Sequence, residues 1–460
     1  MELFDLLIFF LILVVSIIIR SYLILKYGWV GKDSFYHFII GQEIRNKKKI
    51  PDTINNYIYP EKYDYPPLLH LLLSLFNKKY YQKLQYLGVF ADIATGIIIY
   101  LFCLSQFNVN VAILACAFYL FTPMTIDGSF SLGPRSIANL FLVISLISFL
   151  YYYEFGLNSA IFVSVIFSLF VLLTHRLTTQ SLIFSMIVLS YALRSIIPLY
   201  ILMASIILGL IFIKRPYITV IKGHANFIKV FATKLTHKGG RKEMKRMFPN
   251  LISLLFNVPI FILFLMSSSL YESPITKYLS IIGLSLTILS FLWIFGEGIR
   301  HMSNAIFAFA ILSALYISEL NNVYLLIIFI FLSLLFSIYK LLRMEKMLEL
   351  GNITTSDMIS GFEYIKSHKK SDDLLLCIPL DVTYNAAYFT GCKMLQSSGG
   401  FANGLNFNQK LHNLLKEDSS KLIDEYSVDW IFLMIPSIVV NDGKIVFQSG
   451  DITIIKIDRK

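Results

Sequence analysis

Residues 4–25 read FDLLIFFLILVVSIIIRSYLIL, a stretch made almost entirely of apolar side chains. A helix that crosses a lipid bilayer needs about 20 such residues. The run begins next to acidic Glu2 and Asp5 rather than a basic segment, and no A-x-A cleavage site follows it. We therefore interpret it as a membrane-spanning helix and not as a cleavable signal peptide.

The rest of the chain extends this pattern. Of its 460 residues, 56% are hydrophobic and 15% are charged, and the mean hydropathy is +0.68. A soluble domain carries about 25% charged residues, so this composition excludes a cytosolic enzyme or a secreted disulfide scaffold. About eleven apolar runs are long enough to span, near 4–25, 83–105, 108–124, 136–153, 157–174, 178–195, 197–213, 250–269, 277–296, 302–319 and 321–342. The sequence predicts an α-helical polytopic membrane protein.

Two regions depart from the spanning pattern. The polar stretch 26–82 contains two amphipathic segments, Asp33–Arg45 and Pro66–Phe76, which we expect to be interfacial helices with their apolar sides in the lipid. From about residue 350 the composition becomes that of a soluble protein. We therefore expect a transmembrane domain at 1–345 and a small α/β domain at 346–460.

Within 346–460, local signals predict one helix and several strands. Ser356 is a good N-cap for a helix, and 374–378 and 428–435 are typical of buried strands. Residues 438–440 and 444–448 flank Asn-Asp-Gly, which predicts a hairpin.

The positive charge is concentrated in one loop. The net charge is +11, and the segment 214–249 holds ten Lys or Arg residues against one acid, Glu243. A basic loop beside a bilayer is suited to lipid headgroups or an anionic lipid phosphate, and nothing indicates a nucleic-acid partner. The chain has no G-x-G-x-x-G or Walker loop, so we predict no nucleotide cofactor.

The expected topology gathers the unusual polar residues on one side. With the N-terminus in the cytoplasm, alternating spans place 26–82, 214–249 and the C-terminal domain outside, in the cell envelope. The positive-inside rule would instead place 214–249 in the cytoplasm. We expect the outside location, because it brings the polar clusters together.

The first candidate residues are Asp33 and His37, which lie four positions apart and so on one face of a helix. The carboxylate would act as a general base or metal ligand, and the imidazole would bind a substrate hydroxyl or phosphate. The alternative is that Asp33 only caps the helix. His70 follows the rigid Tyr-Pro-Pro segment that opens the second amphipathic helix.

Further candidates lie at the ends of later apolar runs. Asp127 and Arg135 flank a turn rich in Gly, Ser and Pro, and His175 and Arg176 interrupt two spans. Arginine near membrane depth is costly, and its guanidinium is suited to phosphate. The alternatives are a tight turn and arginines that extend to the headgroups.

A charged cluster and one isolated acid complete the set. Glu297 and Arg300 are three positions apart, so Glu297 would either orient a phosphate-binding arginine or merely neutralise it. Asp92 lies inside an apolar run, where a charged side chain costs free energy. We therefore expect it to pair with an arginine, which the sequence does not identify.

These motifs resemble those of GT-C superfamily integral-membrane glycosyltransferases. Asp33–His37 is similar to the first outer loop of that superfamily, and Tyr65–His70 to the Pro-Pro segment of its polyprenyl-phosphate mannosyltransferase-like branch. Residues 174–176 and 296–301 resemble motifs of prokaryotic, especially archaeal, members. The tryptophan-aspartate signature of oligosaccharyltransferase catalytic subunits is missing, so protein N-glycosylation is not predicted.

The resemblance implies transfer of a hexosyl or pentosyl group from a polyprenyl-phosphate-linked donor to a glycan, lipid or protein acceptor. Asp33 would be the catalytic general base of an inverting displacement, with Arg135, Arg176 and Arg300 binding the lipid phosphate. No cofactor is required, although Asp33 and Asp127 together would suit a divalent metal. The alternatives are a multi-span secondary transporter, whose internal repeats we do not find, and a non-catalytic scaffold with the same layout.

Overall fold

The computed structural model describes residues 3–58, 61–234, 251–267, 273–292, 295, 298–348, 353–395, 411, 419–434 and 443–457. The chain divides into two compact units. The helical unit comprises Met1–Tyr22, Tyr65–Leu68 and Tyr86–Met344, and the mixed unit comprises Leu23–Asp64, Leu69–Gln85 and Glu345–Lys460.

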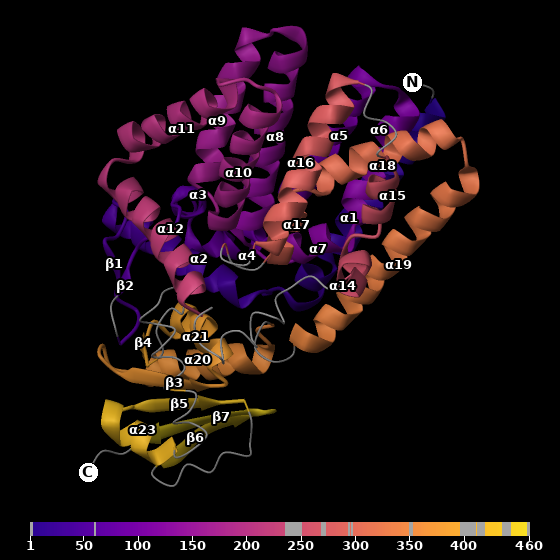
Figure 1. The fold of residues 1–460 in the computed structure, drawn as a ribbon. Coiled ribbons are helices and arrows are strands. Elements are labelled where there is room, and N and C mark those ends of the chain that lie inside the picture. Colours follow the sequence, from indigo (N-terminus) through magenta and orange to yellow (C-terminus); the bar gives the residue numbers. More distant parts are fainter. Residues whose placement is uncertain are drawn as a thin grey trace. The chain divides into compact units, whose positions relative to one another are not determined.

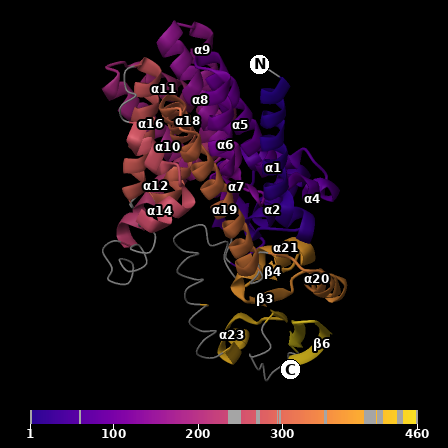
Figure 2. The ribbon, with the colours of Figure 1, turned by 90° about the vertical axis from the view of Figure 1, so that its right-hand side faces the viewer.

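The helical unit is built from antiparallel neighbours such as α8 and α9, which Figures 1 and 2 show side by side. Its described helices are α1 (Leu3–Tyr27), α5 (Leu87–Gln106), α6 (Val109–Phe121), α7 (Pro123–Ser129), α8 (Pro134–Phe155), α9 (Asn158–Leu172), α10 (Arg176–Ala192), α11 (Ile197–Ile213), α12 (Arg215–Lys234), α14 (Leu251–Asn257), α15 (Phe261–Met266), α16 (Pro274–Phe291), α17 (Gly298–Ser303), α18 (Ile306–Leu320) and α19 (Val323–Leu348). Helices α1 and α19 each continue into the mixed unit, to which Leu23–Tyr27 and Glu345–Leu348 belong.

Among the described residues, five helices are long and apolar enough to cross a bilayer: α1, α5, α8, α16 and α19. Helices α6 and α7, bent by 60° at their junction, would make a sixth span. Helices α9, α11 and α18 have 15 to 17 residues, which reach only about 22–26 Å at about 1.5 Å per residue. The chain is a multi-pass membrane protein, whereas the number of about eleven spans stays a prediction.

One expected span is divided in two. The apolar run 250–269 forms α14 and α15, and Pro259 lies between them. Proline has no backbone N–H and cannot continue the helical hydrogen bonds. The hydroxyl of Ser313 on α18 donates to the carbonyl of Ile260 at 3.1 Å, which satisfies part of the interrupted backbone.

The mixed unit combines the first loop with the C-terminal segment. Its elements are α2 (Lys32–Lys47), β1 (Thr53–Ile54), β2 (Glu61–Lys62), α3 (Leu68–Ser74), the 3₁₀ turn η1 (Lys78–Tyr80), α4 (Tyr81–Leu84), α20 (Ser356–His368), β3 (Leu374–Ile378), the 3₁₀ turn η4 (Leu380–Val382), α21 (Thr383–Thr390), β4 (Lys393–Met394), α23 (Ser419–Tyr426), β5 (Trp430–Leu433), β6 (Gly443–Ser449) and β7 (Ile452–Ile457). Helix α3 begins with Leu68 of the helical unit and continues in the mixed unit.

Helix α2 forms where the sequence predicts it, but its apolar side is covered by protein. Phe35 and Phe38 are fully buried. The ring of Tyr388 on α21 lies 5.4 Å from the ring of Phe35 and 5.8 Å from that of Phe38, and Figures 1 and 2 show α2 beside α21. The expectation that this side faces lipid is wrong, because aromatic side chains of the C-terminal segment cover it.

Backbone hydrogen bonds also join the first loop to the C-terminal segment. The N–H of Met394 donates to the carbonyl of Asn56 at 2.9 Å, and the N–H of Ile58 donates to the carbonyl of Met394 at 2.8 Å. The N–H of Thr354 donates to the carbonyl of Trp29 at 3.2 Å. The loop and the C-terminal segment therefore fold as one body.

The C-terminal sheet has the strand order β4-β3-β5-β7-β6. β3 pairs in parallel with β4 and β5, and β7 pairs antiparallel with β5 and β6. The predicted strand 428–435 is the shorter β5, and 444–448 lies in β6, which pairs with β7. The predicted partner strand 438–440 lies outside the described residues.

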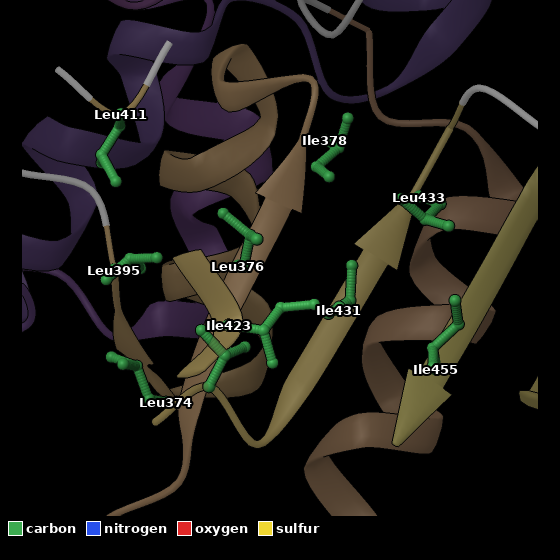
Figure 3. Close-up of a cluster of buried hydrophobic side chains, with 10 residues drawn as sticks. Leu374, Leu376, Ile378, Leu395, Leu411, Ile423, Ile431, Leu433 and Ile455 are labelled. Atoms are coloured by element: carbon green, nitrogen blue, oxygen red, sulfur yellow. The ribbon is translucent and has the colours of Figure 1, made fainter. Parts of the chain in front are cut away.

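The two faces of this sheet bury different side chains. On one face, Phe362 of α20 stacks on Phe432 with ring centroids 4.6 Å apart. The N-cap of α20 is Thr355, one residue before the predicted Ser356, and its side chain accepts from the N–H of Met358. The other face carries an aliphatic cluster (Figure 3) of Leu374, Leu376, Ile378, Leu395, Leu411, Ile423, Val428, Ile431, Leu433 and Ile455.

Candidate functional site

Asp33 is an exposed carboxylate in the first turn of α2. The N-cap is Gly31, whose φ of 83° favours glycine, so Asp33 does not cap the helix and that alternative is wrong. Within the described residues, no hydrogen bond or ion pair engages the Asp33 carboxylate. A carboxylate in a first helical turn is stabilised by the helix dipole, and this one is left available for other chemistry.

His37 takes part in a hydrogen-bonded chain inside the mixed unit. Its Nδ1 lies 2.8 Å from Nε2 of His70, and Nδ1 of His70 lies 2.6 Å from the hydroxyl oxygen of Tyr63. All three side chains are buried. His70 thus has both ring nitrogens engaged within the protein, so we assign it to holding His37 rather than to contacting substrate.

Burial keeps both imidazoles neutral. Desolvation lowers the pKa of His37 to about 4, although the charge of Asp33 acts in the opposite direction. The pKa of His70 also lies well below its usual range, first because it is buried and second because His37 is close. Tyr36 covers the pair, with its ring centroid 5.4 Å from that of His37.

The helical unit contains a separate cluster in which cations outnumber acids. Nη1 of Arg135 lies 3.6 Å from Oδ2 of Asp127, and Nζ of Lys340 lies 3.8 Å from the same oxygen. Arg300 on α17 also acts electrostatically on this carboxylate. We call Asp127, Arg135, Arg300 and Lys340 the cationic cluster, which carries three positive charges and one negative charge.

Local sequence explains how this cluster forms. Pro123 and Pro134 occupy the first positions of α7 and α8, where proline is preorganised for a helix. A Cβ at Gly128 would lie 3.2 Å from the Ser136 hydroxyl and 3.4 Å from Cδ of Arg135. The Gly/Pro turn therefore allows the two helix ends to approach closely enough for Asp127 to meet Arg135.

A buried ion pair lies elsewhere in the helical unit. Nε of Arg20 on α1 lies 3.5 Å from Oδ2 of Asp92 on α5, and both side chains are almost fully buried. Arg20 also donates to Ser16 at 2.6 Å and to Thr125 at 2.8 Å. This identifies the partner that the sequence left open for Asp92. Thr125 is on α7, two residues before Asp127, so the pair also anchors the helix that carries the cationic cluster.

His175 and Arg176 lie at the start of α10. His175 is the N-cap, and its Nδ1 is 2.9 Å from the hydroxyl of Thr178. Arg176 is buried, with its guanidinium 5.4 Å from the ring centroid of Tyr65, a cation–π arrangement. The structure therefore places His175 in a capping role and Arg176 against an aromatic ring, as well as near His224 of α12.

Arg300 is held in place by the short helix α17. A Cβ at Gly298 would lie 1.8 Å from the carbonyl oxygen of Ser290, so only glycine fits at this approach of α17 to α16. Ser181 on α10 hydrogen-bonds Nδ1 of His301 at 3.0 Å and accepts from Nδ2 of Asn304 at 2.8 Å. Glu297, which the sequence paired with Arg300, lies outside the described residues.

The structure thus joins Asp33 electrostatically to His37, which contacts His70, in one unit. In the other unit it joins Asp127 to Arg135 and Arg300. In the part of the chain that is described, no group of three or more His, Cys, Asp or Glu residues is arranged to hold a metal ion. Sequence reasoning missed Tyr63, Arg20 and Lys340. Arg20 could have been found because it is a charged residue inside the apolar run 4–25. For Lys340 the signal is weaker, because it lies near the end of the run 321–342.

No family model matches the chain, and no curated protein matches it in sequence. Similarity appears in solved structures. The archaeal oligosaccharyltransferase AglB from Archaeoglobus fulgidus, in complex with an inhibitory peptide and a dolichol-phosphate, matches with a TM-score of 0.60 and 12% identity, over 94% of this chain and 70% of AglB. ArnT from Cupriavidus metallidurans bound to undecaprenyl phosphate matches with a TM-score of 0.61 and 10% identity, over 97% of both chains.

Both neighbours are membrane glycosyltransferases of the GT-C superfamily, and this chain has the fold that they share. The resemblance drawn from the sequence is confirmed at the level of the fold. The mannosyltransferase-like branch stays a prediction.

Proposed function

We propose that this protein is a membrane glycosyltransferase that moves a sugar from a polyprenyl-phosphate-linked donor to an acceptor hydroxyl, with Asp33 as the general base. The observation that carries the proposal is the exposed carboxylate of Asp33 in the first turn of α2, which no described hydrogen bond or ion pair occupies. The shared fold supports it, because one neighbour was solved with a dolichol-phosphate and another with undecaprenyl phosphate.

The proposed step is a single inverting displacement. The acceptor hydroxyl gives its proton to Asp33, and its oxygen forms a bond to the anomeric carbon of the sugar. The bond from that carbon to the phosphate oxygen breaks, and the polyprenyl phosphate leaves with the electron pair. General-base assistance of this kind contributes about 10²–10⁴-fold to the rate. The donor is already activated, so no nucleotide is needed.

The cationic cluster supplies a second part of the proposal. Its three cations exceed the single charge of Asp127, and the side chains of Arg135 and Lys340 are about four-fifths buried or more. Preorganised cations stabilise the negative charge that grows on a departing phosphate. We propose that this cluster binds the lipid phosphate, with Lys340 added to the arginines that the sequence indicated.

The test of the general base is Asp33→Asn in the purified full-length protein. The readout is release of polyprenyl phosphate from a panel of lipid-linked hexoses and pentoses, which is common to every sugar. We expect at least about 10²-fold less release, with a loss of stability of at most about 1 kcal/mol, the value of a carboxylate in a first helical turn. Asp372→Asn, which alters another exposed acid of the same unit, is the control and should retain activity.

Two results would contradict the proposal. Full activity of Asp33→Asn would exclude this residue as the base. Uptake of a labelled solute into proteoliposomes, without release of polyprenyl phosphate, would indicate the transporter. The extracytoplasmic location of the mixed unit is tested separately: in a cysteine-free variant, Ser360→Cys should react with a membrane-impermeant thiol reagent on intact cells.

A further inference from the structure

The chain Tyr63–His70–His37 does more than fill the interior of the mixed unit. His70 is fully buried, and Tyr63 and His37 are at most 4% exposed. The two bonds, 2.6 Å and 2.8 Å long, occupy the Tyr63 hydroxyl, both nitrogens of His70 and Nδ1 of His37. His70 links the other two side chains, so a change at Tyr63 reaches His37 through these two bonds.

We propose that Tyr63 and His70 are positioning residues that hold His37 in one neutral tautomer, with its proton on Nε2. A neutral imidazole has one donor and one acceptor nitrogen, so the direction of one bond sets the direction of the next. When the Tyr63 hydroxyl donates to Nδ1 of His70, the proton of His70 is on Nε2 and is donated to Nδ1 of His37. The proton of His37 must then be on Nε2.

The opposite direction is disfavoured by acid–base chemistry. It requires the phenol oxygen to accept from an imidazole N–H, although the phenol is the better donor and the imidazole nitrogen the better acceptor. Charging either ring is also disfavoured, because both lie in surroundings that lower the pKa of the imidazole. The chain therefore contains one proton on each ring and one direction of donation.

The consequence concerns the face of α2 that His37 shares with Asp33, four residues earlier. With its proton on Nε2, the imidazole of His37 has its donor on that nitrogen and no basic lone pair outside the bond to His70. With its proton on Nδ1, it would offer a basic lone pair that competes with Asp33 for the proton of the acceptor hydroxyl. This inference rests on the proposed role of Asp33 for its functional meaning, but the tautomer itself is a property of the folded protein.

The tautomer is measured by solid-state NMR on the full-length protein, labelled with ¹⁵N-histidine and reconstituted in lipid bilayers. Protonated and unprotonated ring nitrogens have separate ¹⁵N shifts, and His37→Gln and His70→Gln assign the signals. We expect His37 to show a protonated Nε2 and an unprotonated Nδ1. Tyr63→Phe removes the first donor and should give a mixture of both tautomers.

Tyr81→Phe is the matched control, because Tyr81 is a buried tyrosine of the same unit whose hydroxyl donates to the carbonyl of Leu73. Its spectrum should keep the single His37 tautomer. A wild-type His37 with its proton on Nδ1, or a Tyr63→Phe spectrum identical to wild type, would overturn the proposal.

An activity measurement separates this inference from the proposed function. Tyr63→Phe should lower kcat by up to about tenfold, the value of one hydrogen bond, with little change in KM, whereas Tyr81→Phe should change neither. Asp33→Asn should lower transfer by at least about 10²-fold and leave the His37 tautomer as it is. If Asp33→Asn is active while the tautomer result holds, the proposed function fails and the positioning chain stands.

Discussion

Arg20 and Asp92 place opposite charges in the interior of the helical unit, each almost inaccessible to solvent. Breaking a buried pair leaves an uncompensated charge, which costs about 3–5 kcal/mol. We expect Asp92→Leu to lower the stability of the protein by this amount, because Arg20 keeps only its neutral partners Ser16 and Thr125. Thermal unfolding in detergent measures the loss.

The double variant Arg20→Met/Asp92→Leu is the control for this prediction. Replacing a whole buried pair with apolar residues of similar size is often neutral or stabilising. The double variant should therefore be more stable than Asp92→Leu alone. Equal destabilisation of both would show that packing at these positions, and not the unpaired charge, dominates.

The two buried imidazoles make the mixed unit sensitive to acid. Burial lowers the pKa of His37 from 6.5 to about 4, so between these values the unfolded chain binds a proton that the folded chain does not. The free energy of unfolding must then decrease as the pH falls from 6.5 to 4, by about 3 kcal/mol for His37 alone. Above pH 6.5 the contribution of the neutral His37 to the free energy of unfolding should be fully present.

Chemical denaturation at several pH values measures this dependence. His37→Gln should remove most of it, whereas His368→Gln, at an exposed position at the end of α20, should retain it. A wild-type protein whose unfolding midpoint is the same at pH 7 and pH 4.5 would contradict the prediction.

At the scale of elements, Gly41 sets the distance between α2 and α3. A Cβ on Gly41 would lie 2.7 Å from Cβ of Leu73, closer than real side chains approach. Arg45 holds the same pair of helices by donating to the carbonyls of Ser74 and Leu75 at the end of α3. This close packing brings His37, four residues before Gly41, against His70.

We expect Gly41→Ala to separate the two helices and lengthen the bond between His37 and His70. Overpacking of this kind costs about 1–3 kcal/mol, and the same ¹⁵N spectra would show the loss of the single His37 tautomer. Gly133→Ala makes the same chemical change where a Cβ meets nothing within 4 Å. It should leave the single His37 tautomer as in wild type.

Helices were the part of the fold that sequence predicted well, because each depends on residues that are neighbours in the chain. The periodicity of Asp33–Arg45 is enough to predict α2, and the spacing of Asp33 and His37 places them on one face. The N-cap of α20 was displaced by only one residue, since Thr355 and Ser356 have equivalent hydroxyls.

The partners of the candidate residues could not be predicted in the same way. Lys340 lies 213 positions after Asp127, and Asp92 lies 72 positions after Arg20. Such pairs depend on how whole helices pack, and one sequence contains no periodic signal for that packing. For the same reason the sequence does not show that protein covers the apolar side of α2, because Tyr388, which contacts Phe35, is more than 350 residues away in the chain.

At the scale of the whole molecule, the two chain segments that form the mixed unit constrain the membrane topology. The first loop and the C-terminal segment belong to one compact body, so both must lie on the same side of the membrane. The chain between them must therefore cross the bilayer an even number of times. This holds whichever of the short apolar helices α9, α11 and α18 are counted as spans.

The same body predicts that the C-terminal segment is needed to fold the first loop. Tyr388 is buried on α21, with its ring 5.7 Å from Trp29 and 5.4 Å from Phe35 and with Nζ of Lys78 4.2 Å above it. Tyr388→Ala removes this anchor from a distant part of the chain. We expect a loss of about 3–5 kcal/mol and faster proteolysis at Lys47, in the first loop.

The matched control is Phe447→Ala, which removes an aromatic ring of the same segment that packs on Tyr364, 5.2 Å away, and so within the C-terminal sheet and helix layers. If loop and segment fold together through Tyr388, only Tyr388→Ala should expose the loop to protease and reduce sugar transfer, although Asp33 is intact in both. If the two variants expose the loop equally, the aromatic contact is not what holds it. Any substitution that destabilises the C-terminal segment would then expose the loop, whether or not it removes a contact with the loop.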